Sequence, residues 1–455
     1  MFWGNLIMRL NSLVSSACES MSVSVSQVHV FIPGKNWKLS LAELISFLEA
    51  REVVFKLEAF SRDFFVLNIQ GETPRIEDLG GTIKIGALSK TIQTELFEKA
   101  FLQSDKQAKN QIEEEIASSK AISGMLEKAS GKYLFGVSVY CTAESLRPLS
   151  ARIQRFVGSS VKRQLSEHGV RSDFMGFSRD REQPQLTHVE VLKKNLVEGK
   201  GEVLLCLGKE QTWLAVTTAV HDPFEFQKRD VGKPNQRKIF AIPPRLARIM
   251  VNLSACKIRS VLLDPFCGVG TILQEALLAK AEVVGVDTNQ WCVEAATENL
   301  EWLKKEYGLK DAEFRVLKGD ALRLKSIIGS EVDCIATEPD LGPALRDIPT
   351  TPYAEKIVNK LTPLYSGFLR EAFNVLRKEG RLVLVTPYLK TRSGKPVKMR
   401  IEEKAEEIGF KGVYPFGGDV FGKATVVKEN MRNLRSFIDV AERHKTGREI
   451  HVFQK

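Results

Sequence analysis

The sequence predicts an α/β protein in which a Rossmann-like sheet domain follows a smaller α+β region. From about residue 242 onward, apolar runs of strand length alternate with helical patterns up to the C-terminus. Within that half, residues 260–273 have the pattern of a strand, a Gly-x-Gly turn and the start of a helix, which opens many nucleotide-binding units. Residues 28–85 instead show the order strand, helix, strand, strand, which suggests a small ferredoxin-like unit.

Composition and charge narrow the class of protein. At 455 residues the chain is long enough for two or three domains, and its net charge of +10 favours a polyanionic partner such as nucleic acid. Ordinary solubility charge is the alternative explanation. The seven cysteines form no CxxC pair, which argues against zinc fingers and a disulfide framework and for a reducing compartment. No apolar run reaches about 18 residues, so we expect a cytoplasmic protein without a membrane span.

The pattern divides the chain into five segments. Residues 1–25 are Ser-rich and irregular, and we interpret them as a disordered leader or as a start codon placed too early, with Met21 as the true start. Residues 26–105 form the ferredoxin-like unit, in which Ser40 and Glu43 are spaced as a helix capping box. The remaining segments are a second small unit at 106–220, a basic linker at 221–241 and the Rossmann-like domain at 242–455.

The second unit is predicted in more detail. We expect helices around residues 107–127 and 150–168, and strands that begin near residues 132, 189, 202 and 213. Basic side chains lie along the helix 150–168 and through the linker, where prolines stiffen the chain. Basic residues on a helix usually just form its solvent-exposed side, but the overall positive charge of this chain favours contact with RNA phosphates. The predicted RNA-binding residues are Arg152, Arg155, Lys162, Arg163, Lys228, Arg229, Lys233, Arg237 and Lys238.

The glycine loop of the C-terminal domain predicts a ligand without a pyrophosphate. A dinucleotide fingerprint would place a third glycine at position 273, where this chain has Leu273, so S-adenosylmethionine is the favoured cofactor. Two further strands end in acids: Asp287 is placed to accept from ribose hydroxyls, or else to cap a helix, and Asp320 to accept from an adenine amino group. Three acids at one sheet edge favour a methyltransferase. The predicted cofactor-binding residues are Asp264, Pro265, Phe266, Cys267, Gly268, Gly270, Thr271, Asp287, Asp320 and Ala321.

A fourth strand, residues 332–337, runs into Glu338-Pro-Asp-Leu-Gly342, which suggests chemistry on an exocyclic amine. Such an amine is a poor nucleophile, and transfer is helped by a side-chain oxygen and a backbone carbonyl that accept its hydrogens. Glu338 and Pro339 meet these needs, and we predict Glu338, Pro339 and Asp340 as catalytic residues. The aromatic residue that would stack on a flipped base is missing from its usual place; the candidates to replace it are Tyr353, Tyr388 and Phe266.

Cysteine and metal chemistry are not expected. Cys334 falls inside a predicted strand, which gives little support to a cysteine nucleophile, and Cys267 is interpreted as a small residue packed close to the ligand. None of the six histidines lies in a recognisable catalytic or metal-binding pattern, so we predict no metal.

Three segments together resemble a known family: residues 264–271, residues 229–253 and the C-terminal Arg448-Glu-Ile-His-Val-Phe453. The chain resembles the THUMP-containing tRNA guanosine-2-amino methyltransferases of archaeal type, which modify guanosine 10. The resemblance implies a ferredoxin-like plus THUMP half that binds tRNA and a Rossmann-like half that methylates from S-adenosylmethionine. The family's fourth motif commonly reads Asp-Pro-Pro-Tyr-Gly, whereas this chain has Asp340 and Leu341 in place of the second proline and the aromatic.

The resemblance implies that five residues line the cofactor and that Glu338 and Pro339 face the guanine amine. The five are Asp264, Gly268, Gly270, Asp287 and Asp320. We therefore expect a tRNA (guanine-2-amino) methyltransferase that acts as a monomer. Two alternatives stay open: a tRNA-binding protein with weakened or lost catalysis, and a methyltransferase that acts on ribosomal RNA or on another position of tRNA.

Overall fold

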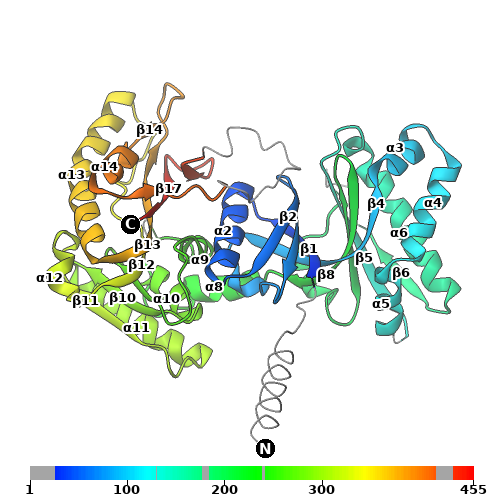
Figure 1. The fold of residues 1–455 in the computed structure, drawn as a ribbon, viewed down its shortest axis with the longest axis horizontal. Helices are drawn as coiled ribbons and strands as arrows, with labels where there is room; N and C mark the ends of the chain where they lie inside the picture. Colours follow the sequence, from blue (N-terminus) through cyan, green and yellow to red (C-terminus); the bar gives the residue numbers. More distant parts are fainter. Residues whose placement is uncertain (1–25, 130, 177–183, 238–240, 417–433) are drawn as a thin grey trace, which may run out of the picture.

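The computed structural model describes residues 26–129, 131–176, 184–237, 241–416 and 434–455. The predicted leader at 1–25 and the predicted RNA-binding residue Lys238 lie outside these ranges. Two sheets and their helices occupy the two ends of an elongated molecule, with α2 (Trp37–Ala50) and α9 (Pro244–Leu253) between them (Figure 1). Within the described ranges, no helix combines the length and apolar character needed to cross a membrane.

The N-terminal half contains one continuous sheet of eight strands in the order β2-β3-β1-β4-β8-β7-β5-β6. Strand β4 pairs with β1 on one side and with β8 on the other, so the predicted boundary at residue 105 divides two units that share a single sheet. The strands are β1 (Ser26–Pro33), β2 (Val54–Phe60), β3 (Phe65–Gln70), β4 (Thr82–Gln93), β5 (Tyr133–Cys141), β6 (Ser172–Met175), β7 (Gly201–Leu207) and β8 (Gln211–Val220). The helices are α2 (Trp37–Ala50), α3 (Thr94–Leu102), α4 (Lys106–Ala117), α5 (Lys120–Lys128), α6 (Ser150–Glu167) and α7 (His188–Lys193).

Several local predictions for this half are wrong. The strand expected from residue 189 is the helix α7, because Thr187 and Glu190 form a capping box that starts a helix there. The single helix expected at 107–127 is the pair α4 and α5. Ser40 does not cap α2: Asn36 is its N-cap, and Ser40 lies one turn inside the helix. The strand β2 was not predicted.

The C-terminal half has the predicted parallel sheet, in the order β11-β10-β9-β12-β13-β17-β15, with β17 antiparallel to β13 as expected. Its strands are β9 (Val261–Asp264), β10 (Glu282–Asp287), β11 (Phe314–Lys318), β12 (Val332–Thr337), β13 (Leu376–Leu389), β14 (Val397–Lys398), β15 (Lys411–Gly412), β16 (Ser436–Asp439) and β17 (Thr446–Gln454). Its helices are α8 (Pro223–Val231), α9 (Pro244–Leu253), α10 (Thr271–Leu278), α11 (Gln290–Tyr307), α12 (Leu324–Ile328), α13 (Thr351–Val375) and α14 (Ile401–Ile408).

Two apolar layers cover the C-terminal sheet. Residues of α13 and α14 pack on one face, while α9 and α10 pack on the other. The second layer continues without a break into the core around α2 of the N-terminal half. The apolar contact therefore joins the two halves of the molecule.

The segment predicted as a basic linker is partly helical and partly buried. Its helix α8 places Arg229 beside Glu275 of α10, which also accepts from Arg248 of α9 at 3.0 Å. All three side chains are at most 6% exposed, so this charged group is part of the core. This group therefore packs the linker helix α8 onto α9 and α10 of the C-terminal half.

Candidate active site

The loop after β9 is shaped by two glycines and a buried acid. Gly268 and Gly270 have φ values of 51° and 83°, in the left-handed region that side chains rarely adopt, and Gly270 is the N-cap of α10. Asp264 is 2% exposed and accepts from Thr337 Oγ1 at 2.7 Å. Burial raises the pKa of Asp264 to about 7, although the hydrogen bonds from Thr337 and from the backbone N–H of Phe266 oppose the shift.

The three strand-end acids lie at the same edge of the sheet, because β9, β10 and β11 are adjacent and parallel. Asp287 accepts from the backbone N–H of Gly268 at 3.0 Å, which ties the second strand to the glycine loop. The N-cap of α11 is Asn289, so Asp287 is not that cap. Asp320 is exposed and accepts from the N–H of Leu322, while Ala321 beside it is buried.

Glu338 follows β12 directly and lies next to the glycine loop. Its carboxylate receives a fork of two hydrogen bonds from Arg448 of β17, at 2.5 Å from Nε and 3.2 Å from Nη2. Burial raises the pKa of Glu338, and the charge and hydrogen bonds of Arg448 act in the opposite direction. Asp264 and Glu338 line one cavity of about 50 Å³; its other lining residues include Phe266, Cys267, Gly268, Thr271 and Arg237.

The rest of the fourth motif has a structural role in this conformation. Leu341, in the position where an aromatic was expected, is 6% exposed and packs in the core, so it cannot stack on a base. The backbone carbonyl of Asp340 accepts from Tyr365 at 3.0 Å, and its carboxylate accepts from Gly342 N–H. Of the candidate replacements, Phe266 packs edge-on against Phe368, Tyr388 lies under Lys398, and Tyr353 is 49% exposed.

Comparisons with known proteins find methyltransferases over parts of the chain. A family model described as an RMKL-like methyltransferase domain (UPF0020) matches residues 234–412, and one described as a DNA methylase (N6_N4_Mtase) matches residues 94–298. The tRNA (guanine(10)-N2)-dimethyltransferase of Methanothermobacter thermautotrophicus is 36% identical over 160 residues, which are 34% of this chain and 43% of that protein. The enzyme of that name from Pyrococcus abyssi is 31% identical over 232 residues, 51% of this chain and 61% of that protein.

A shorter relative is covered more completely. The probable tRNA (guanine(10)-N2)-dimethyltransferase of Methanothermococcus thermolithotrophicus is 31% identical over 150 residues, which are 31% of this chain and 79% of that protein. The chain belongs to the tRNA (guanine(10)-N2)-dimethyltransferase family. It spans about half the length of the first two relatives. A solved structure, TrmN from Thermus thermophilus, has 17% identity and a TM-score of 0.48 over 94% of this chain and 99% of that chain.

In this member of the family, the linker residues predicted to bind RNA are mostly engaged inside the protein. Arg229 pairs with Glu275, and Lys233 is 4% exposed and donates to Thr271 Oγ1 at 2.9 Å, so the prediction that these two bind phosphates is wrong. Lys228 is exposed but pairs with Glu306. Arg237 lines the cavity beside the glycine loop, where it faces Gly268. Sequence reasoning identified these residues as basic but could not show which way they face.

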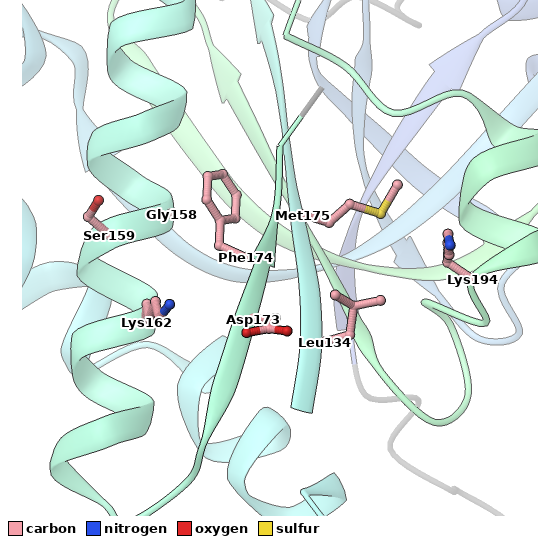
Figure 2. A pocket seen from close by; sticks show the side chains of 8 residues that line it. All are labelled: Leu134, Gly158, Ser159, Lys162, Asp173, Phe174, Met175 and Lys194. Carbon is pink, nitrogen blue, oxygen red and sulfur yellow. The ribbon is translucent and has the colours of Figure 1, made fainter. Parts of the chain in front are cut away.

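Helix α6 presents the other predicted RNA-binding residues of this family member. Arg152, Arg155, Lys162 and Arg163 are all exposed, and Arg163 pairs with Glu113 of α4. Lys162 lines a cavity of about 570 Å³ between α6 and β6 (Figure 2). The wall of this cavity includes Asp173, Phe174, Met175 and Lys194. The ring of Phe174 packs against Gly158 of α6 and lies 5.4 Å from the ring of Phe135, so it belongs to the wall, and Lys162 and Lys194 are the basic side chains of the cavity.

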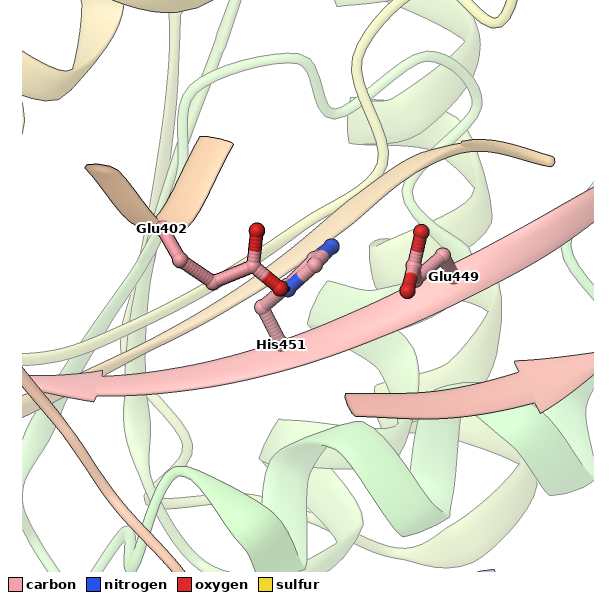
Figure 3. A group of neighbouring side chains, drawn as sticks. All are labelled: Glu402, Glu449 and His451. Atoms are coloured by element: carbon pink, nitrogen blue, oxygen red, sulfur yellow. The ribbon is translucent and has the colours of Figure 1, made fainter. Parts of the chain in front are cut away.

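One group of residues has the donor atoms for a metal ion. Within the described ranges, Glu402, Glu449 and His451 have ligand atoms within 4.8 Å of one another. In Figure 3 the imidazole of His451 lies between the two carboxylates. Lys398 Nζ already contacts Glu449 Oε1 at 2.8 Å, and Thr386 Oγ1 contacts His451 Nε2 at 3.0 Å. We assign the group to ion pairs that anchor β17, the strand that carries Arg448.

Arg448 is the functional candidate that sequence reasoning missed. It is 110 residues from Glu338 in sequence, and only the antiparallel insertion of β17 beside β13 brings the two side chains together. The segment around Arg448 supported the family resemblance, but no spacing rule connects it to the fourth motif.

Proposed function

We propose that the protein transfers methyl groups from S-adenosylmethionine to the exocyclic 2-amino group of a guanosine in tRNA, guanosine 10 by analogy with its relatives. The observation that carries the proposal is the position of Glu338, a nearly buried carboxylate that shares a cavity with the glycine loop and Asp264. The names of the relatives support tRNA as substrate and guanine N2 as the target.

The residues at the cavity and along the neighbouring strand ends suit the parts of S-adenosylmethionine. When bound, the cofactor supplies an electrophilic methyl group on a positively charged sulfur. Asp264, with its left-handed glycine loop and the N-terminus of α10, offers negative charge and free N–H groups at the loop. Asp287 and Asp320 take the ribose and adenine roles at the ends of the next two strands. Arg237, which the sequence suggested for RNA, lines the same cavity, and this supports a pairing with the carboxylate of the cofactor.

The acceptor side consists of Glu338 and Pro339. A carboxylate oxygen of Glu338 and the carbonyl of Pro339 accept the two amine hydrogens, which localises the nitrogen lone pair and stabilises the positive charge that forms on transfer. Pro339 is suited to this role because its ring restricts the backbone of the loop. For Asp340, which was also predicted as catalytic, we propose that it supports the loop, since its carboxylate accepts from Gly342 N–H and its carbonyl accepts from Tyr365. For base stacking we propose Tyr353, the exposed aromatic at the start of α13.

The N-terminal half is proposed as the tRNA-binding part, with a ferredoxin-like unit and a THUMP unit that share the eight-stranded sheet. Support comes from the exposed basic residues of α6 and from the net charge of +10. We further propose that the protein acts in the cytoplasm as a monomer.

The test is methylation of tRNA transcripts with labelled S-adenosylmethionine, followed by nucleoside analysis. We expect methylguanosine in wild-type transcripts and none when guanosine 10 is replaced. Glu338→Gln should lower turnover about 100-fold, while Glu331→Gln, an exposed acid just before the same strand, should have no effect. Methylation that persists without guanosine 10 would indicate another position or another RNA.

A second candidate is a tRNA-binding protein with lost catalysis. The burial of Leu341, where the family commonly has an aromatic, is the observation that favours it. Tight tRNA binding with no methylguanosine on any transcript would establish this alternative, whereas multiple turnovers of the wild-type protein would exclude it.

A further inference from the structure

The fork between Arg448 and Glu338 is the most enclosed ion pair at the candidate site. The two side chains are 13% and 9% exposed, and Arg448 Nη2 also donates to the carbonyl of Ala241 at 3.4 Å. Planar guanidinium groups match carboxylates in this two-point geometry, which fixes both position and orientation. Arg448, on the C-terminal strand β17, thus holds the carboxylate that the reaction is proposed to use.

The surroundings of Glu338 make this pairing necessary. Asp264 lies on the neighbouring strand, and Asp439 of β16 is opposite Arg448 in the strand register. Tyr365 of α13 and Arg237 of the linker also face this region. Without Arg448, Glu338 would be a nearly buried acid beside two other carboxylates, a setting that favours the protonated form.

We propose that Arg448 is a positioning residue that keeps Glu338 ionised and oriented toward the acceptor amine. This inference rests on the proposed function and deepens it. A carboxylate has about four lone-pair positions. The arginine fork uses two of them, so each oxygen keeps one position for a hydrogen of the amine. A protonated Glu338 would instead present an O–H group to the amine and lose the negative charge.

The charge on Glu338 matters at the moment of transfer. The lone pair of the amine nitrogen forms the new bond to the methyl carbon, and the electron pair of the breaking sulfur–carbon bond returns to sulfur. The sulfur becomes neutral, the nitrogen becomes positive, and the nitrogen then loses one proton to water. An ionised carboxylate held in place stabilises that positive nitrogen without having to reorganise.

A double-variant cycle tests the proposal, with single-turnover methylation of tRNA by wild type, Arg448→Gln, Glu338→Gln and the double variant. If Arg448 acts through Glu338, Arg448→Gln should slow transfer at neutral pH about 10-fold or more, yet add almost nothing in the Glu338→Gln background. The affinity for S-adenosylhomocysteine should stay within about twofold in every variant. If the rate losses of the two single substitutions multiply in the double variant, the proposal is overturned.

The pH profile gives a second readout that a purely structural role would not move. Activity is lost as pH falls through the pKa of Glu338, because the ionised form is required. Removal of Arg448 should raise that pKa. The low-pH side of the rate profile, the acid limb, should therefore shift to higher pH by about one pH unit or more. Arg448→Lys, which keeps the charge but not the fork, should give an intermediate limb. An unchanged limb in Arg448→Gln would contradict the proposal.

The ionisation of Glu338 is also measurable without turnover. Infrared difference spectra between proteins with and without the Glu338→Gln substitution report the protonated carboxyl directly. The band of the protonated Glu338 carboxyl group should be absent at neutral pH in the protein that has Arg448. It should appear in the Arg448→Gln variant. A protonated band in both proteins would sink this proposal while leaving the methyltransferase activity untouched. Failure of the wild type to methylate any tRNA would instead count against the proposed function.

Discussion

The carboxylate of Glu43 on α2 accepts a 2.8 Å hydrogen bond from the side-chain amide of Asn252 on α9. The same carboxylate accepts from the backbone N–H groups of Gly80 and Gly81, each at 2.7 Å. Gly80 touches α9 so closely that a Cβ there would come within 2.2 Å of the Arg245 carbonyl oxygen. This buried acid therefore joins three segments at the contact between the two halves of the molecule.

Loss of Glu43 should weaken the whole fold. Glu43→Ala leaves the two glycine N–H groups and the Asn252 amide without their acceptor inside the core, and we expect a loss of about 3 kcal/mol in the free energy of unfolding. Equilibrium unfolding in urea measures this change in the free energy of unfolding. Glu72→Ala, at an exposed acid in the same half, is the control and should change stability by less than about 0.5 kcal/mol. Equal effects of the two substitutions would contradict the assignment.

Arg237 should distinguish the cofactor from an analogue that lacks its carboxylate. Arg237→Gln removes the proposed charge-assisted pair, so affinity for S-adenosylmethionine should fall about 10-fold or more. Affinity for decarboxylated S-adenosylmethionine should not change, because that molecule has no carboxylate to lose. Calorimetric titration measures both, with Lys228→Gln in the same linker as the control. A similar loss for both molecules would exclude the proposed contact.

Asp264 should make cofactor affinity depend on pH. Its pKa of about 7 lies above the ordinary value of 3.8, so its contribution to stability is complete below about pH 4 and is lost as pH rises through about 7. A bound sulfonium favours the ionised carboxylate, so affinity for S-adenosylmethionine should rise as pH increases through about 7. Calorimetric titrations with S-adenosylmethionine, in buffers of different ionisation enthalpy, should show that binding releases a proton near pH 6. Asp264→Asn should abolish that release, whereas a flat affinity in the wild type would refute the argument.

The exposed face of α6 should account for part of the tRNA affinity. Arg155→Gln with Lys162→Gln removes two positive charges, and the slope of log affinity against log salt should become shallower by roughly 1.4 to 1.8. Filter binding over a range of salt concentrations measures it. Arg163→Gln on the same helix is the matched control, because Arg163 pairs with Glu113 and should contribute less. An unchanged slope in the double variant would place the RNA on another surface.

The parts of the site that the sequence could predict are those encoded in one short segment. The glycine loop at 264–271 and the acids at the ends of β10 and β11 need only strand periodicity and the rule that parallel strands end at one edge. The direction of a side chain is different, because it depends on partners that are distant in sequence. Arg229 became a core residue through Glu275, and Glu43 joined the two halves instead of capping α2. For the same reason Arg448 gave no signal of its contact with Glu338.

The single sheet of the N-terminal half has a consequence for target choice. Its eight strands, at about 4.8 Å per interval, set roughly 34 Å of rigid width between its two edges. Helix α6 packs at the β5-β6 end of this sheet, whereas α2, beside β1 and β2, contacts α9 of the catalytic half. If RNA binds at α6 as proposed, the rigid sheet would present to the cavity only a nucleotide at one fixed distance from that binding site. Selection of the target would then depend on length along the folded RNA more than on the bases around it.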